Sequence, residues 1–135
     1  GKTLIHTAGA TNKQEELFNN LPDQDKFLEA MADAASSVVK YFKGNAAYIN
    51  VMKNISIDCD CDGNASAPCM KDIGILASLD PIAIDQACLD LVYNSEDPGK
   101  DKLINRIESL HGVHTVEASA ELGFGTREYE LINID

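Results

Sequence analysis

Carboxylates and thiols alternate along one short segment of this sequence, residues 58–69, which we call the cysteine loop. The alternating residues are Asp58, Cys59, Asp60, Cys61 and Asp62, and a third thiol follows at Cys69. On an extended segment, side chains two positions apart point to one side, so two thiols could bind one ion and Cys69 could return as a third ligand. Thiolates select zinc, copper(I) or iron–sulfur units. A carboxylate completes such a shell, and the residues available for it are Asp58, Asp60 and Asp85.

The same segment also contains the opening of a calcium-binding motif. Its alternating aspartates and Gly63 reproduce the start of an EF-hand loop, in which carboxylate oxygens converge on the ion and glycine permits a sharp turn. The twelfth position, which requires a bidentate glutamate, is Cys69, and Pro68 precedes it. The segment upstream is predicted to be a strand, where an EF-hand has its entering helix. A hard cation remains an alternative ligand, but a true EF-hand is not expected.

Other chemistries fit the cysteines less well. An iron–sulfur cluster usually needs four cysteines, and the fourth one, Cys88, falls on the apolar stripe of a predicted helix, where a small core residue is expected. A disulfide between Cys59 and Cys61 would close a tight, strained ring, and neighbouring carboxylates raise the pKa of both thiols. An enzyme using the carboxylates as general bases would lack a histidine, serine or lysine partner. The competing interpretation is a non-catalytic interaction or scaffold domain with a solvated acidic loop.

The acidity of the chain is concentrated around this loop. Of 135 residues, 22 are acidic and 11 basic, which gives a net charge of -11. Nine acidic residues lie within positions 58–97 against Lys71 alone, so this stretch carries -8 of the total. Nucleic acid and anionic membranes need a basic face, so neither is expected as a partner. Since no apolar run reaches membrane-spanning length and no signal peptide is present, we expect a cytoplasmic domain.

Apolar periodicity predicts the elements that hold the loop. Apolar side chains from Phe27 to Phe42 repeat at helical spacing behind a capping Asp23. Further helices are predicted from Pro81, over 103–110 and over 114–122. Strands are predicted over 3–7, 47–52 with a continuation at 55–57, 73–77 and 128–134, and the 73–77 strand is expected to be buried on both faces. These elements indicate an α/β fold in one domain, with a small mixed sheet of about three to four strands packed with about four helices.

The predicted elements also suggest how other polar residues are placed. If strands 47–52 and 73–77 are neighbours, the cysteine loop and the helix that follows Asp80 both hang from strand ends, and Asp85 is then expected near the loop. Asp80 is expected to cap that helix. Arg127 follows a glycine-rich turn and is expected to contact an anion or to form an ion pair.

Several separate motifs, in order along the chain, resemble one known family. They are the run 55–61 with its Asp58-Cys59-Asp60-Cys61 motif, Pro68, the run 72–78, the run 80–87 that opens with Asp80-Pro81, and the run 121–131 around Gly123-Phe124-Gly125. Together they cover about residues 25–132 and are similar to the C-terminal part of the domain-of-unknown-function family 362, whose members are often labelled uncharacterised Fe–S centre proteins.

The resemblance implies a metal-binding or iron–sulfur-associated domain of unknown activity, acting with a redox partner protein. The family's motif maps onto Asp58, Cys59, Asp60 and Cys61, whereas Cys69 is peculiar to this sequence. Many members carry a ferredoxin-like insert, Cys-x2-Cys-x2-Cys-x3-Cys-Pro, which is missing from this sequence. Family members also have a preceding α/β region, so we expect residues 1–135 to be the C-terminal fragment of a longer protein. The expected cofactor is an iron–sulfur cluster or a soft divalent metal.

Overall fold

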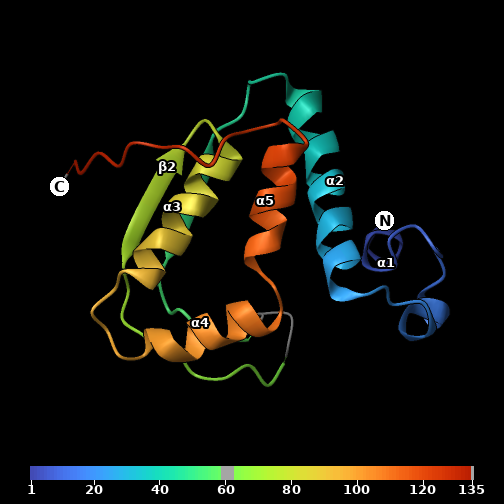
Figure 1. Ribbon diagram of the computed structural model, residues 1–135, viewed down its shortest axis with the longest axis horizontal. Helices are drawn as coiled ribbons and strands as arrows, with labels where there is room; N and C mark the ends of the chain where they lie inside the picture. Colours follow the sequence, from blue (N-terminus) through green and yellow to red (C-terminus); the bar gives the residue numbers. More distant parts are fainter. Residues whose placement is uncertain (59–62, 135) are drawn as a thin grey trace.

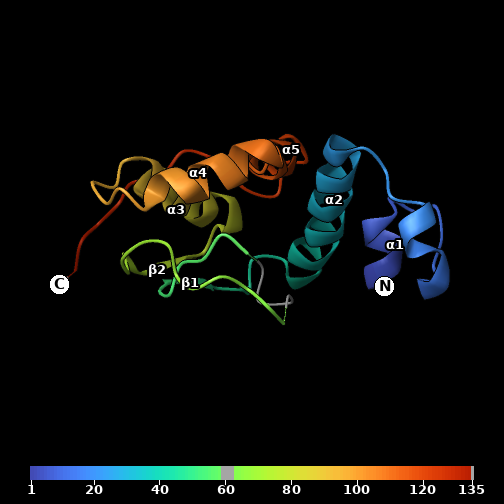
Figure 2. The ribbon, with the colours of Figure 1, turned by 90° about the horizontal axis from the view of Figure 1, so that it is seen from below.

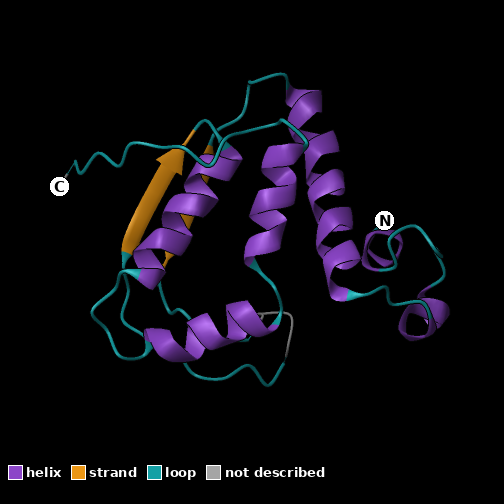
Figure 3. Cartoon of the chain, in the orientation of Figure 1, coloured by secondary structure: helices purple, strands orange, loops and turns teal. Residues whose placement is uncertain are grey.

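In the described part of the chain, helices come before and after two short strands that follow one another. A computed structural model describes residues 1–58 and 63–134. In these residues the elements are α1 (Lys2–His6), the 3-10 helix η1 (Gln14–Asn19), α2 (Gln24–Phe42), β1 (Tyr48–Met52), β2 (Gly74–Ser78), α3 (Pro81–Tyr93), α4 (Lys100–Ser109) and α5 (Val113–Glu121). Figures 1 and 3 show their arrangement. The α/β class is therefore confirmed for a single domain.

The sheet is smaller than the sequence predicts. Strands β1 and β2 pair antiparallel, with Tyr48 opposite Ser78 and Met52 opposite Gly74. Within the described residues the sheet has these two strands, so the predicted mixed sheet of about three to four strands is wrong. Because the pairing is antiparallel, the end of β1 that leads to the cysteine loop lies beside the start of β2.

Helices cover one face of this sheet. Figure 2 shows α3 and α4 on one side of the strands, and α3 packs against both β1 and β2. Helix α5 contacts α3 and α2, and α1 contacts α2 (Figure 1). The opposite face presents Ile49 (67% exposed), Val51 (59%) and Ile75 (71%) to solvent. The expectation that residues 73–77 are buried on both faces is therefore wrong, since only the α3 side of the sheet is covered in the described residues.

The core beneath α3 forms around two methionines and a valine. Met52, Met70 and Val92 are buried together, and Cys69 and Cys88 pack partly buried against them. This cluster joins the end of β1, the segment that leads into β2, and α3. It gives the cysteine loop a firm base, because burial of large apolar side chains is the main stabilising contribution in a domain of this size.

The two longest helices begin where the sequence predicts. The Asp23 carboxylate accepts the backbone N–H of Lys26 at the start of α2, and α2 ends at Lys43 in the left-handed conformation (φ 50°). Asp80 caps α3, with Pro81 in its first turn. No helix in the described residues combines the length and apolarity that crossing a membrane requires.

Two predicted terminal strands are wrong. Residues 3–7 lie largely in helix α1, since a short apolar run does not by itself distinguish the helical from the extended conformation. Residues 128–134 belong to no strand; they run beyond α5 without a ladder partner, and Leu131 and Ile132 are exposed (Figure 1). A strand needs a neighbouring edge to satisfy its backbone groups, and neither strand of this sheet supplies one to this segment.

Candidate functional site

The cysteine loop is closed by hydrogen bonds at its two sides. Both the backbone N–H and the hydroxyl of Ser66 donate to Oδ2 of Asp58, at 3.0 and 2.6 Å. The Ser56 hydroxyl donates to the Ser66 carbonyl at 2.8 Å. These Ser66 hydrogen bonds hold the pKa of Asp58 below its ordinary value. The segment from Asp58 to Ser66 is thereby closed at its two ends, and the Asp58 carboxylate stays charged at neutral pH.

Three of the predicted ligands lie outside the described residues. Cys59, Asp60 and Cys61 fall within the gap between positions 58 and 63. Their roles as ligands therefore stay predictions. The chain places them between Asp58 and Ser66, whose side chains are joined directly.

Cys69 lies at the base of the loop. Its backbone N–H donates to the Ile55 carbonyl at 2.8 Å, and its partly buried side chain packs on the Met52, Met70 and Val92 cluster. A Cβ atom at Gly99 would overlap the carbonyl oxygen of Cys69, so the start of α4 approaches the loop as closely as a glycine permits. Cys69 is a free thiol in a well-fixed position.

Asp85 contacts the middle of strand β1. Asn50, in the middle of β1, donates from Nδ2 to the Asp85 carboxylate at 2.8 Å and to the sulfur of Cys88 at 3.4 Å. Helix α3 starts at the Ser78 end of the sheet, opposite the end of β1 that leads into the loop. The Asn50 contact places Asp85 at the middle of β1, and its expected nearness to residues 59–62, which lie outside the described residues, stays a prediction. Its role as a ligand is not tested by this placement alone and stays a prediction.

Cys88 is a core thiol, as its position in the apolar stripe predicts. Burial raises its pKa, the nearby Asp85 charge adds to this effect, and the Asn50 hydrogen bond opposes it. The thiol is therefore protonated at neutral pH. Beside it, β1, α3, α4 and α5 line an open, mainly apolar cleft of about 540 Å³. Asn50 is a polar residue of this cleft that the sequence pattern did not single out, because an asparagine in the middle of a strand carries no spacing signal.

The described residues alone do not assemble a metal centre. Among them, no group of three or more histidine, cysteine, aspartate and glutamate side chains converges on one position. The described hydrogen bonds of Asp58, Cys69 and Asp85 are made to different partners. A metal site in the cysteine loop thus requires the residues between Asp58 and Gly63.

The start of α3 is tied to the segment that follows α5. Oδ1 of Asp80 accepts the N–H groups of Ile82 and Ala83, and Oδ2 accepts the N–H of Thr126 at 2.9 Å. A Cβ atom at Gly125 would overlap this carboxylate and the Ile82 side chain. The cap is thus confirmed, and its second role in holding residues 125–126 was not visible in the sequence.

Arg127 forms the ion pair that was one of its two expected roles. Its guanidinium lies 3.2 Å from the Glu117 carboxylate and donates from Nε to the Gln86 side chain at 2.8 Å. The segment after α5 is thereby fixed to both α3 and α5.

The comparison with known families agrees with the motifs. The profile of the domain of unknown function DUF362 matches residues 1–90 of the 135. The chain belongs to the DUF362 family. The match includes the cysteine loop and the first part of α3, and it ends before the glycine-rich turn at 123–125. No curated protein and no solved structure matches the chain.

Proposed function

We propose that this DUF362 domain binds one thiophilic divalent metal ion through the thiolates of Cys59 and Cys61. The observation that supports this most is the closure of the loop, since the Ser66 bonds to Asp58 tie together the residues that flank both thiols. Two thiols that are confined in a closed loop lose less conformational freedom on binding an ion than two thiols on a free segment. A bound ion of this kind would stabilise the loop and act as a Lewis acid.

Cys69 is the third ligand in this proposal. Its backbone bond to Ile55 and its packing on the core hold it at the base of the loop, and it forms no disulfide within the described residues. A carboxylate, Asp58 or Asp60, completes a four-coordinate shell. The charge of -8 over residues 58–97 favours accumulation of a cation here.

A single ion is favoured over a four-iron cluster. Such a cluster requires four cysteine thiolates, and this chain has 4 cysteines in all. The sulfur of Cys88 lies 3.4 Å from the Asn50 side chain in the middle of β1, and burial raises the pKa of this thiol and keeps it protonated. The loop therefore offers three thiols, which suits a mononuclear soft-metal site.

The competing function is a non-catalytic interaction domain whose acidic loop is solvated or binds a hard cation. The observation that favours it is the exposed apolar face of the sheet, formed by Ile49, Val51 and Ile75. Exposed apolar clusters on small domains commonly mark interaction surfaces.

Metal analysis separates the two functions. The chain is purified anaerobically, and metal content, visible spectrum and thermal stability are measured for wild type, the Cys59→Ser/Cys61→Ser double variant and Cys88→Ser as the matched control. We expect about one soft ion per chain in wild type and in the control, and loss of the ion in the double variant. A metal-free wild type as stable as the double variant would contradict the proposal. Stabilisation by Ca²⁺ that survives the double substitution would favour the hard-cation alternative.

A further inference from the structure

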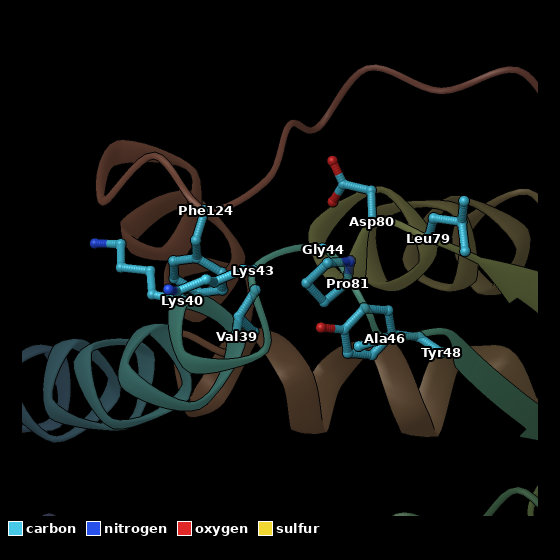
Figure 4. Close-up of a pocket in the computed structure, with 10 residues that line it drawn as sticks. All are labelled: Val39, Lys40, Lys43, Gly44, Ala46, Tyr48, Leu79, Asp80, Pro81 and Phe124. Atoms are coloured by element: carbon cyan, nitrogen blue, oxygen red, sulfur yellow. The ribbon is translucent and has the colours of Figure 1, made fainter.

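A second site lies at the end of the sheet opposite the cysteine loop. There the end of α2, the start of β1, the start of α3 and the turn after α5 enclose a cavity of about 370 Å³, which we call the lysine cavity. Figure 4 shows its lining side chains. The residues that matter for the argument are Lys40, Lys43, Tyr48, Asp80, Pro81 and Phe124.

Two lysines border the lysine cavity in an otherwise acidic chain, and in Figure 4 the Lys40 side chain extends away from Tyr48 and Pro81. Lys40 and Lys43 are two of only 11 basic residues, against 22 acidic ones. Lys40 donates to the Leu122 carbonyl at 3.4 Å, and neither lysine forms an ion pair with a carboxylate in the described part of the chain. The left-handed conformation of Lys43 and Gly44 ends α2 at this point and turns the chain around the cavity.

Asp80 also borders the cavity, and both of its carboxylate oxygens already accept hydrogen bonds from the backbone. Its two oxygens accept three backbone N–H groups, from Ile82, Ala83 and Thr126. In Figure 4 its carboxylate points away from the Tyr48 hydroxyl. The N–H groups at the start of α3 are likewise occupied by this cap, so the lysines are the groups that remain to receive an anion.

The other walls of the cavity are flat and apolar. The rings of Tyr48, Phe124 and Pro81 come from three different parts of the chain, and the Tyr48 hydroxyl points toward the end of α2 (Figure 4). Ring faces bind planar apolar groups, and a lysine ammonium binds a phosphate or carboxylate as a point charge. We propose that the lysine cavity binds a flat organic anion, with its ring between Tyr48 and Phe124 and its anionic group at Lys40 and Lys43.

The test uses 1-naphthyl phosphate as the probe, with 1-naphthol and inorganic phosphate as its two halves. Binding to the full chain is followed by backbone amide chemical shifts. We expect saturable shifts at Lys43, Tyr48 and Phe124 with the whole probe, weaker binding of either half, and weaker binding as the salt concentration rises. No saturation by about 5 mM probe would overturn the proposal.

Charge variants identify the site. Lys40→Ala/Lys43→Ala should weaken binding of the probe by about tenfold, because two partly screened charge contacts are lost. Lys53→Ala/Lys102→Ala removes the same charge from exposed positions elsewhere and should leave the affinity within about twofold. Equal loss in the two double variants, or equal binding of 1-naphthol and 1-naphthyl phosphate, would show that the cavity does not recognise an anion. Because none of these residues lies in the cysteine loop, the outcome is independent of metal binding.

Discussion

The two ends of strand β1 (Tyr48–Met52) lie in opposite chemical surroundings. At its start, Tyr48 lines the lysine cavity, where two basic side chains meet aromatic rings. At its end, Met52 leads into the cysteine loop, where carboxylates and thiols alternate and Ser66 holds Asp58. Five residues of one strand therefore separate a surface suited to anions from a segment suited to cations.

The two ends of β1 nevertheless share one packing feature. Each depends on a glycine that lets a distant segment approach closely: Gly99 against the carbonyl of Cys69 at the loop, and Gly125 against Asp80 at the lysine cavity. The difference between the two ends thus resides in the functional side chains rather than in how the backbone is held. Changes to the packing should disturb both ends alike, whereas changes to polar groups should affect one end only.

The largest effects on stability are expected from substitutions at these two glycines. Gly99→Ala and Gly125→Ala each place a Cβ atom within overlap distance of backbone or side-chain atoms, and each should lower the free energy of unfolding by about 3 kcal/mol. Chemical denaturation measures this. Gly63→Ala, whose Cβ would meet no described atom within 4 Å, is the control and should change stability by under about 1 kcal/mol. If Gly99→Ala were as harmless as the control, the loop base would not be held as described.

A smaller effect is expected at the cap of α3. Asp80→Ala removes the acceptor of three backbone N–H groups and should cost about 1–2 kcal/mol in the free energy of unfolding. Asp80→Asn keeps a capping oxygen and should lose less than half as much. In addition, the amide of Thr126 should exchange its hydrogen faster in both variants, because an asparagine that keeps the cap replaces the Oδ2 acceptor by an NH₂ donor. Equal stability of both variants and wild type would show that the cap does not hold the lysine cavity.

The hydrogen bonds that close the cysteine loop can be tested by titration. Since Ser66 holds the pKa of Asp58 below the ordinary 3.8, Ser66→Ala should raise that pKa, as measured by carboxyl carbon chemical shifts. The lowered pKa means that the stabilisation is fully present above pH 3.8 and is lost as the pH falls through the folded-state value. Ser56→Ala is the control, because it removes the bond to the Ser66 carbonyl and leaves both Ser66 bonds to the Asp58 carboxylate in place. An unchanged Asp58 pKa in Ser66→Ala would contradict the closed loop.

The smallest effect concerns the contact between helices α2 and α5. His114 in α5 lies 3.2 Å from Glu29 in α2, and this hydrogen bond raises the pKa of His114 above its ordinary 6.5. The stabilisation is therefore full below pH 6.5 and is lost as the pH rises through the folded-state value. The melting temperature of wild type, relative to His114→Gln, should fall between about pH 6 and pH 8. The melting temperature of Glu29→Gln should depend on pH as weakly as that of His114→Gln. If the melting temperatures of all three proteins changed with pH in parallel, this contact would contribute nothing.

The sequence predicted best those elements whose signals are local. Helix α2 was found because its apolar period is long and Asp23 marks its start, and α3 because Asp80-Pro81 is a start signal in itself. The strands at 48–52 and 74–78 were found from their composition. Residues 128–134 were not predicted correctly, because strand formation depends on a partner edge that no local pattern reveals.

The candidate sites likewise have some features that local sequence patterns reveal and others that they do not. Alternating side chains identified the cysteine loop, and the Ser66 bonds that close it were not predictable, because they join residues on either side of a loop. The lysine cavity was missed because its residues come from four separate segments, which no local pattern joins. Asp85 was expected near the loop because the two strands were predicted to be neighbours, which they are, and its described contact is with Asn50 in the middle of β1.

A cadmium titration tests most directly whether the cysteine loop holds one soft metal ion. Cd²⁺ is added anaerobically to the metal-free chain while the ultraviolet thiolate-to-cadmium absorption is followed. We predict a band that saturates at about one ion per chain, that is lost in Cys59→Ser/Cys61→Ser, that weakens in Cys69→Ser and that persists in Cys88→Ser. An absent band in wild type, or an undiminished band in the Cys59→Ser/Cys61→Ser variant, would contradict a soft-metal site in this loop.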